Sequence, residues 1–399
     1  MTKKLNKIEK LIEELCPEGV GFKELVEIAD ILNGYSFKSG KYTKEGIRVI
    51  RISDVQKGKM SSKDLKFYPI ELASEIKKYL LKENDLVMSL TGNVGRVAML
   101  SKFDLPAGLN QRVACIRAKR NLVLTRYLFH FFDQNSFENL AMSNATGGGQ
   151  KNMSTTWLAK LKIPIPPLPV QKEIVKILDS FTELEAELEA ELEARKKQYE
   201  YYRDELLTFG DEVVRKSLDE VCFSINAGGD LPKNYLKGQK NPTDEFPYPI
   251  YSNGTDDSAL YGYTNSYKVN KEAITISARG TIGYHTIRLP KFTPIVRLIT
   301  LIPNNKLITT KFLNYILDIT EIGHSGGSIP QLTVPNVKKI KIPVPPIKTQ
   351  EKIVAILDKF DALVNDISIG LPAELKARRQ QYEYYREKLL TFKPLNNNY

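Results

Sequence analysis

The chain has 399 residues, 42% of them hydrophobic and 26% charged, and a formal net charge of +11. This length allows two or three domains with their own cores, and the composition is that of a globular protein rather than a disordered or fibrous one. No apolar run approaches the length of a membrane span, and the first residues are charged where a secretion signal is apolar, so we expect a cytoplasmic protein. The three cysteines lie too far apart in sequence to suggest a disulfide scaffold or a zinc ribbon.

The positive charge is unevenly spread. Residues 171–209 contain 6 basic and 11 acidic residues and residues 350–392 contain 7 of each, so the excess of positive charge lies in the rest of the chain. Lysine and arginine neutralise phosphates, and this distribution favours a nucleic-acid partner for the globular parts. A basic protein without such a partner remains the alternative.

The first globular segment mixes helices and strands. After a short helix at 3–15, the patterns predict a strand at 47–55 and two strands at 85–100 that turn at residues 91–93. A helix follows at 125–140, opened by a threonine cap. A glycine loop at 146–151 then leads into a proline-rich extended segment at 163–167, which suits the edge of a sheet. The glycine loop is compatible with a phosphate cradle and with a structural turn.

A long helix comes next. Apolar residues recur every three or four positions from Ile174 to Leu206, which predicts a helix of roughly 36–40 residues. Residues 183–194 are three tandem copies of the tetrapeptide Glu-Leu-Glu-Ala. Four residues lengthen a helix by about 6 Å, and a coiled coil absorbs such a stutter. The run is therefore a candidate ruler, with low-complexity filler as the alternative.

The second half of the chain repeats the first. A strand pair at 273–289, a threonine-capped helix at 309–321 and a proline-rich segment at 342–346 follow in the same order. A second long helix at 353–392 should be interrupted or kinked by Gly370-Leu371-Pro372. In this alignment Arg112 falls opposite Arg297, and the two glycine loops coincide.

These patterns predict an α+β chain with a pseudo-twofold repeat. Two similar α/β globular domains, at 1–160 and 210–339, are separated by two long helical segments that pair as an antiparallel coiled coil. The helical segments comprise residues 161–209 and 340–399, the second with a C-terminal tail.

Catalytic motifs are scarce in the sequence. His130, His285 and His324 do not have metal-ligand spacing, and no phosphate-binding Gly-x-x-x-x-Gly-Lys loop occurs. Residues 241–244 resemble the Asn-Pro-Pro-aromatic motif of adenine methyltransferases only superficially, because the aromatic residue is missing. We expect no catalytic residue, metal or cofactor on this chain. Two alternatives to a non-catalytic DNA-binding protein remain. One is a self-contained methyltransferase or nuclease, and the other is a coiled-coil adaptor without a DNA role.

The candidate DNA-binding residues are polar or basic positions, and glycines, near the two strand pairs and the two glycine loops. They are Arg96, Gln111, Arg112, Gly148, Gln150, Lys151, Asn152, Arg279, Arg297, Gly326, Gly327 and Gln331. The candidates for spacing and subunit docking lie on the long helices: Leu184, Leu188, Leu192, Tyr199, Tyr202, Tyr382 and Tyr385.

Four elements together resemble a known family. They are the paired segments IPIPPLPVQKEIVKILDSF and IPVPPIKTQEKIVAILDKF, the helix ends QYEYYR…LLTF, the preceding Gly-Gly loops, and the opening residues 15–20. This combination, over essentially the whole chain, is similar to the specificity (S) subunit of type I restriction–modification enzymes.

The resemblance implies a non-catalytic role. Each globular domain would be a target-recognition domain reading one half of a bipartite, asymmetric DNA site. The helices would set the gap and dock two methyltransferase (M) subunits, with restriction (R) subunits joining the complex. S-adenosylmethionine, ATP and Mg²⁺ would belong to those partners.

Overall fold

The computed structural model describes residues 2–322, 331–366 and 368–395. The chain divides into two compact units, and each contains parts of both repeats. The first unit runs to Glu189 and resumes at Leu375, while the second comprises Ala190–Glu374. Among the described residues, no helix has a stretch long and apolar enough to cross a bilayer.

The first unit begins with the N-terminal half of the repeat. Its strands are β1 (Phe22–Glu24), β2 (Ala29–Asn33), β3 (Ile47–Ile50), β4 (Phe67–Tyr68), β5 (Leu86–Ser89), β6 (Val97–Met99), β7 (Ala107–Leu109), β8 (Val113–Ala118) and β9 (Lys162–Pro164). Its helices are α1 (Thr2–Leu15), α2 (Leu25–Ile28), α3 (Thr125–Phe132), α4 (Asn135–Ser143) and α5 (Thr155–Ala159), followed by the start of α6 (Leu168–Leu207).

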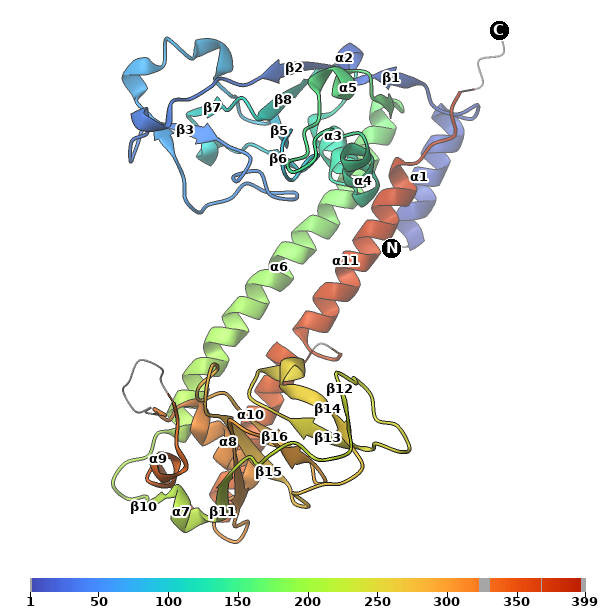
Figure 1. Ribbon diagram of the computed structural model, residues 1–399. Helices are drawn as coiled ribbons and strands as arrows, with labels where there is room; N and C mark the ends of the chain where they lie inside the picture. Colours follow the sequence, from blue (N-terminus) through green and yellow to red (C-terminus); the bar gives the residue numbers. More distant parts are fainter. Residues whose placement is uncertain (1, 323–330, 367, 396–399) are drawn as a thin grey trace. The chain divides into compact units, whose positions relative to one another are not determined.

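Three small sheets organise this unit (Figure 1). The central one has the order β2-β8-β5-β6 with antiparallel neighbours, and a second has the order β4-β3-β7 with β3 and β7 parallel. The proline-bearing strand β9 pairs only with β1, so it lies at an edge as predicted. One face of the central sheet packs on α3, α4 and the start of α6 in a continuous apolar core.

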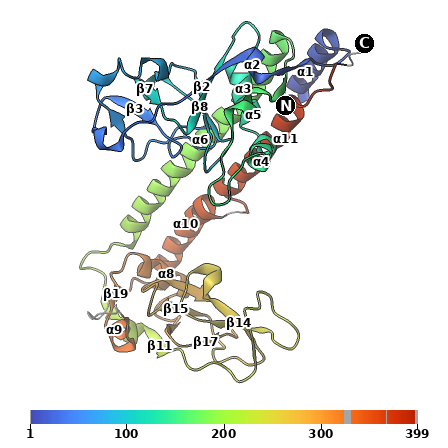
Figure 2. The same ribbon diagram turned by 45° about the horizontal axis from the view of Figure 1, so that its top comes forward.

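The last helix of the chain, α11 (Leu371–Leu390), completes the first unit, where it lies beside α6 (Figures 1 and 2). The ring of Phe181 lies 5.9 Å from that of Tyr382 and 5.7 Å from that of Tyr385. One turn further along α6, Glu185 pairs with Arg379, one turn earlier on α11. The contacts run in opposite order along the two helices, so the helices are antiparallel, as the sequence predicts.

The second unit repeats the same plan. Its strands are β10 (Arg215–Ser217), β11 (Cys222–Ala227), β12 (Tyr235–Lys237), β13 (Tyr248–Tyr251), β14 (Leu260–Thr264), β15 (Ala273–Ser277), β16 (His285–Arg288), β17 (Thr293–Pro294), β18 (Leu298–Pro303) and β19 (Lys341–Pro343). Its helices are α7 (Leu218–Val221), α8 (Thr310–Asp318), α9 (Val334–Lys338) and α10 (Ile347–Asn365), with the end of α6.

The sheet orders show the repeat directly. The sheet β11-β18-β15-β16 corresponds strand by strand to β2-β8-β5-β6, and the pair β10-β19 corresponds to β1-β9. In the remaining sheet, β12-β14-β13-β17, strand β13 is parallel to β17 just as β3 is parallel to β7. The chain is therefore an α+β protein built from two similar units, as predicted.

The long helices agree with their predicted lengths. Helix α6 has 40 residues and passes without a break through the tetrapeptide run. The second long helix is interrupted, because α10 ends at Asn365 and α11 begins at Leu371. A Cβ at Gly370 would lie 2.4 to 2.8 Å from three backbone carbonyl oxygens, so this turn requires glycine.

Four details of the sequence prediction were wrong. The strand expected at 47–55 ends at Ile50, because Arg51 and Asp54 bind each other in a turn. The helix expected at 125–140 is two helices, α3 and α4, separated where the Asp133 carboxylate binds Arg386 of α11. The expected threonine cap is present on α8, where Thr309 accepts from the Phe312 amide (3.2 Å), but α3 has a leucine there without a side-chain cap. Helix α8 also ends at Asp318, short of residue 321.

Candidate nucleic-acid interface

Three separate segments of the first unit converge at the end of the central strand β5. The amide of Leu90 donates to the carbonyl of Arg112 (3.0 Å), and the carbonyl of Leu90 accepts from the amide of Met153 (2.8 Å). Arg112 precedes β8, and Met153 follows the glycine loop. The backbone thus brings the β5–β6 turn, the β7–β8 turn and the glycine loop to one edge.

The second unit uses the same backbone arrangement. The amide of Ala278 donates to the carbonyl of Arg297 (2.9 Å), and the carbonyl of Ala278 accepts from the amide of Leu332 (2.9 Å). Arg112 and Arg297 therefore occupy equivalent positions, which confirms that part of the sequence alignment.

Two candidate residues lie exposed on the β7–β8 turn. The amide of Gln111 donates to the Tyr35 carbonyl (2.9 Å), and the amide of Arg112 donates to Oδ1 of Asn110 (3.2 Å). Within the described parts of the chain, the Arg112 guanidinium has no hydrogen bond or ion pair. The turn is thus held by its backbone while a positive side chain points outward, an arrangement suited to contacting a phosphate or a base edge.

Arg96 is placed differently. Its Nε lies 3.5 Å from Oε1 of Glu138 on α4, and Oε2 of the same carboxylate is 3.2 Å from Nζ of Lys57. A phosphate approaching Arg96 would therefore compete with an existing ion pair.

The glycine loop is a closed turn that displays its tip. Backbone hydrogen bonds join Thr146 and Asn152 in both directions, at 2.9 and 2.8 Å. The Asn152 side chain is used internally, because its Oδ1 accepts from Thr91 (2.7 Å) and its Nδ2 donates to the Gln150 carbonyl (3.1 Å). Gly147 has φ +110°, and a Cβ there would lie 2.4 Å from the Gln150 carbonyl oxygen.

The tip of this loop has open space around it. A Cβ at Gly148 would meet nothing within 4 Å, and Gln150 and Lys151 are exposed. Of the predicted loop residues, Gly148, Gln150 and Lys151 are available to a ligand, whereas Asn152 shapes the loop.

In the second unit, Arg297 is exposed and has a left-handed backbone, φ +74°. Arg279 is half-buried, and its carbonyl accepts from Nδ2 of Asn253 (3.1 Å). Neither guanidinium has a hydrogen bond or ion pair in the described part of the chain. Gly326 and Gly327 lie outside the described residues. Gln331 is the first residue of the next described segment; it is exposed and has an interaction partner.

The chemistry of this edge is that of hydrogen-bond donation and positive charge. Arginine, lysine and glutamine side chains, together with open backbone at Gly148, match phosphate oxygens and base acceptors. Among the described residues, no three His, Cys, Asp or Glu side chains are placed to hold a metal ion. The donors and positive charges at this edge are suited to binding a polyanion.

Helices α3 and α8 are each anchored to the neighbouring long helix by an aspartate, a feature that the sequence analysis did not predict. In the first unit, Oδ1 of Asp179 on α6 accepts from Nε of Arg126 (2.7 Å) and lies 2.7 Å from Nε2 of His130. In the second unit, Asp358 on α10 binds Lys311 (2.5 Å) and Tyr315 (2.8 Å). The signal was present, since a basic residue follows the threonine in both copies and an aspartate recurs in both proline-led segments.

His130 joins three helices of the first unit. It is fully buried, and its Nδ1 lies 3.0 Å from the hydroxyl of Tyr382 on α11. Burial lowers the pKa of His130, and it prevails over the hydrogen bond and charge of Asp179, which act in the opposite direction. A neutral ring then donates from Nε2 to Asp179 and accepts from Tyr382 at Nδ1.

The predicted docking residues on the helices take part in packing within the chain. Tyr199 and Tyr202 surround Phe360 at 6.5 and 5.7 Å, the same arrangement that Tyr382 and Tyr385 make around Phe181. Leu188 is buried, and Leu184 and Leu192 are half-buried. The most exposed tyrosines are the equivalent Tyr201 and Tyr384, at 64% and 62%, and Tyr202 is also exposed, at 38%.

Both repeats of the chain match a known protein family. Residues 17–194 and 210–377 each match the family described as "Type I restriction modification DNA specificity domain". The specificity subunit of an Escherichia coli type I restriction enzyme is 33% identical over 317 residues, covering 73% of this chain and 76% of that protein. A putative type I restriction enzyme specificity subunit from Haemophilus influenzae is 36% identical over 306 residues, covering 71% and 76%.

Two solved structures share the fold. The type I restriction-modification S subunit from M. genitalium aligns with a TM-score of 0.55 and 19% identity, over 93% of this chain and 96% of that one. A chain from a study of complex assembly and conformational transition in a type I R-M system aligns with a TM-score of 0.63 and 17% identity, over 93% and 97%.

Proposed function

Because this chain belongs to the type I restriction-modification specificity family and carries two DNA specificity domains, we propose that each domain reads one half of a bipartite, asymmetric DNA site. The observation that carries the proposal is the convergence of the same three segments at the end of β5 and of β15. The backbone frame and an exposed arginine are common to both units, whereas the exposed residue before that arginine is Gln111 in one unit and Val296 in the other. Two frames with unlike side chains suit two half-sites of unlike sequence.

We also propose that the long helices set the spacing between the two half-sites. Helix α6 is continuous through the three tetrapeptides and belongs to both units. Arg379 of α11 pairs with both Glu185 and Glu189, one glutamate from each of the first two copies. Deleting Glu187–Ala190 removes one copy and shortens the helix by about 6 Å. We expect this deletion to change the preferred gap and to leave both half-sites unchanged.

Two methyltransferase subunits and restriction subunits are the proposed partners. The repeat presents equivalent features twice, including the exposed Tyr201 and Tyr384, and two equivalent surfaces suit two copies of one partner. In this proposal the chain itself is non-catalytic, and S-adenosylmethionine, ATP and Mg²⁺ bind the partner subunits.

The test is to express the chain with its methyltransferase subunits and map the methylated adenines in genomic DNA. We expect a two-part motif with a fixed gap. Replacing residues 1–160 by those of another family member should change one half of the motif only. A single continuous motif, or methylation without sequence preference, would overturn the proposal.

A further inference from the structure

The connection between β3 and β4, residues 51–66, is the most basic loop at the proposed DNA-binding edge of the first unit. We call it the basic loop. It contains five basic residues, Arg51 and four lysines, and two acidic residues, Asp54 and Asp64. Both acidic side chains are engaged by positive groups of the loop itself, so the loop retains unneutralised positive charge.

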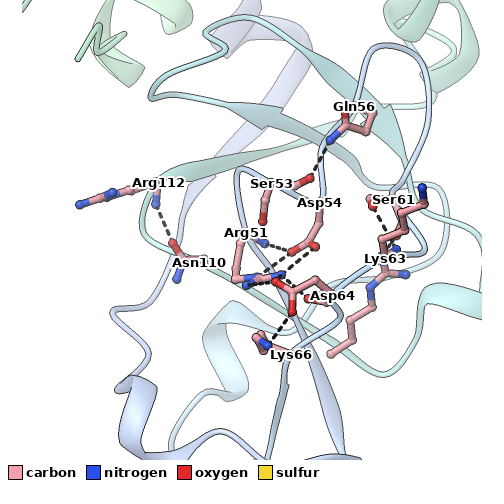
Figure 3. A network of polar contacts seen from close by, with 11 residues as sticks. Arg51, Ser53, Asp54, Gln56, Ser61, Lys63, Asp64, Lys66, Asn110 and Arg112 are labelled. Carbon is pink, nitrogen blue, oxygen red and sulfur yellow. Dashed lines mark hydrogen bonds and ion pairs between the residues drawn. The ribbon is translucent and has the colours of Figure 1, made fainter. Parts of the chain in front are cut away.

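Arg51 holds the two ends of the basic loop together (Figure 3). Its guanidinium binds both carboxylate oxygens of the buried Asp54, at 3.1 and 3.2 Å. It also donates to the backbone carbonyl of Asp64 at 2.5 Å, thirteen residues further along the chain. Burial opposes its charge, but the bonds and charges of Asp54 and Asp64 prevail and raise the pKa of Arg51.

A second arginine fixes the middle of the loop. Arg48 on β3 is buried, binds the Asp104 carboxylate at 2.5 Å and donates to the backbone carbonyl of Ser61 at 2.6 Å. The amide of Ser61 donates in turn to the carbonyl of Asp54 (2.8 Å). A loop held this way loses little conformational entropy when it binds a ligand.

Two lysines of the loop remain unpaired. Lys66 binds Asp64 (2.7 Å), and Lys57 reaches Glu138 (3.2 Å). Lys59 and Lys63 are exposed, and neither ammonium group has a hydrogen bond or ion pair within the described segments.

The basic loop continues into the candidate interface. The amide of Asn110 donates to the carbonyl of Ile50, the residue before Arg51, at 3.2 Å. Asn110 also accepts from the Arg112 amide, and Figure 3 shows the Arg112 side chain pointing away from the Arg51 network. The loop and the β7–β8 turn therefore form one basic edge.

In the described part of the second unit, the connection that corresponds to this loop has a different charge. The matching connection after β13, residues 252–259, contains two acidic residues and no basic one. A contact made by the lysines of the basic loop is therefore specific to the first unit.

We propose that the basic loop binds the phosphate backbone of the first half-site through Lys59 and Lys63. Arg51 is the positioning residue that holds the loop in place for this contact. This inference rests on the proposed function and assigns the contact to one domain. Arg51 acts through the loop rather than on DNA, because its guanidinium is already committed to Asp54 and Asp64.

The experiment uses the full-length chain in complex with its methyltransferase subunits, with a labelled duplex carrying the motif from genomic mapping. Binding is measured across a range of KCl concentrations. Each neutralised phosphate contributes about 0.9 to the slope of log affinity against log salt. We expect the double variant Lys59→Gln/Lys63→Gln to bind several-fold more weakly, with a slope reduced by about two.

The matched control removes two exposed lysines from the β1–β9 pair, Lys23→Gln/Lys162→Gln, and should leave the slope unchanged. Arg51→Lys keeps the charge but loses the fork that spans Asp54 and Asp64. Because the loop is then held less firmly, this variant should lower the affinity and the salt slope, by less than the double lysine variant does, while discrimination at the second half-site stays at the wild-type value.

The outcomes separate the two proposals. If the wild-type complex shows no preference for the mapped duplex, the proposed function fails. If it binds that duplex and the lysine variant keeps the wild-type slope and affinity, only the role of the basic loop fails. A lysine variant that loses methyltransferase subunits instead of DNA affinity would show that the loop contacts protein, which also overturns the inference.

Discussion

Each unit has a buried glutamine at the start of its long helix, and replacing it should destabilise that unit alone. Gln171 is fully buried on α6. Its Oε1 accepts from the amide of Leu124 (2.9 Å), and its Nε2 donates to the carbonyls of Leu122 (3.2 Å) and Pro166 (2.8 Å). One side chain thus joins the entry to α3, the proline-rich segment and α6.

The change Gln171→Leu keeps the side-chain size and removes all three partners. Each buried backbone group left without a hydrogen bond costs about 1–3 kcal/mol. The apolar leucine offsets part of this, and we expect a net loss of about 3–5 kcal/mol in the first unit. This corresponds to a rise in the opening equilibrium of roughly two to four orders of magnitude.

Hydrogen exchange on the full-length chain, read by peptide, gives the measurement. Gln171→Leu should accelerate exchange in α3 and leave α8 unchanged. Gln350 makes the equivalent bonds in the second unit, accepting from Thr309 (2.9 Å) and donating to Leu307 (2.9 Å) and Pro345 (2.8 Å). Gln350→Leu should therefore show the reverse pattern.

The exposed Gln380 provides the control, since Gln380→Leu removes no buried partner. Unchanged exchange in α3 after Gln171→Leu would refute the reasoning. Equal acceleration in both units would show that the glutamine is not specific to its own unit.

Three further predictions concern buried or half-buried groups. The pKa of His130 is lowered in the folded state, so its contribution to stability is lost as the pH falls below the unfolded value of 6.5. Burial opposes the charged form of His285, but Asp318 and two backbone carbonyls prevail and raise its pKa. Its contribution to stability is therefore present below pH 6.5 and is lost as the pH rises through the folded pKa. Between about pH 8 and 6, exchange corrected for its intrinsic rate should accelerate in α3 and slow in α8, and parallel changes would contradict these assignments. Arg386→Ala should destabilise the first unit by about 3–5 kcal/mol in a denaturant titration, because it leaves the Asp133 carboxylate buried without its cation; a loss under 1 kcal/mol would count against this. Burial raises the pKa of Cys222 to about 12, so its thiol should react with a disulfide reagent at pH 7.5 far more slowly than a free cysteine, and reaction at the free-thiol rate would be the contrary result.

The repeated arrangement of helices and strands could be predicted well because it depends on local sequence patterns. The apolar stripe of α6, the glycine and proline at 370–372 and the alternating strands around residues 91–93 each depend on neighbours in sequence. The alignment of Arg112 with Arg297 also predicted which backbone positions meet the ends of β5 and β15.

The failures arise where a distant partner decides the structure. Asp133 ends α3 through Arg386, which lies 253 residues away. Arg51 was assigned to a strand, but it forms a turn because both Asp54 and Asp64 bind it. For the same reason the sequence could place Arg96 and Asn152 near the interface without revealing that Glu138 and Thr91 already occupy them.

The anchoring of α3 has a consequence for the domain exchange described under the proposed function. If residues 1–160 are replaced by those of a relative, the new α3 must pack against Asp179 and Tyr382, which lie outside the replaced segment. A graft with a basic residue at 126 and a hydrogen-bonding ring at 130 would seat there, and one with two apolar residues would leave the Asp179 carboxylate without its partners. Under the proposed function, such an exchange would give a working subunit only where the new domain fits α6 and α11 as well as its own half-site.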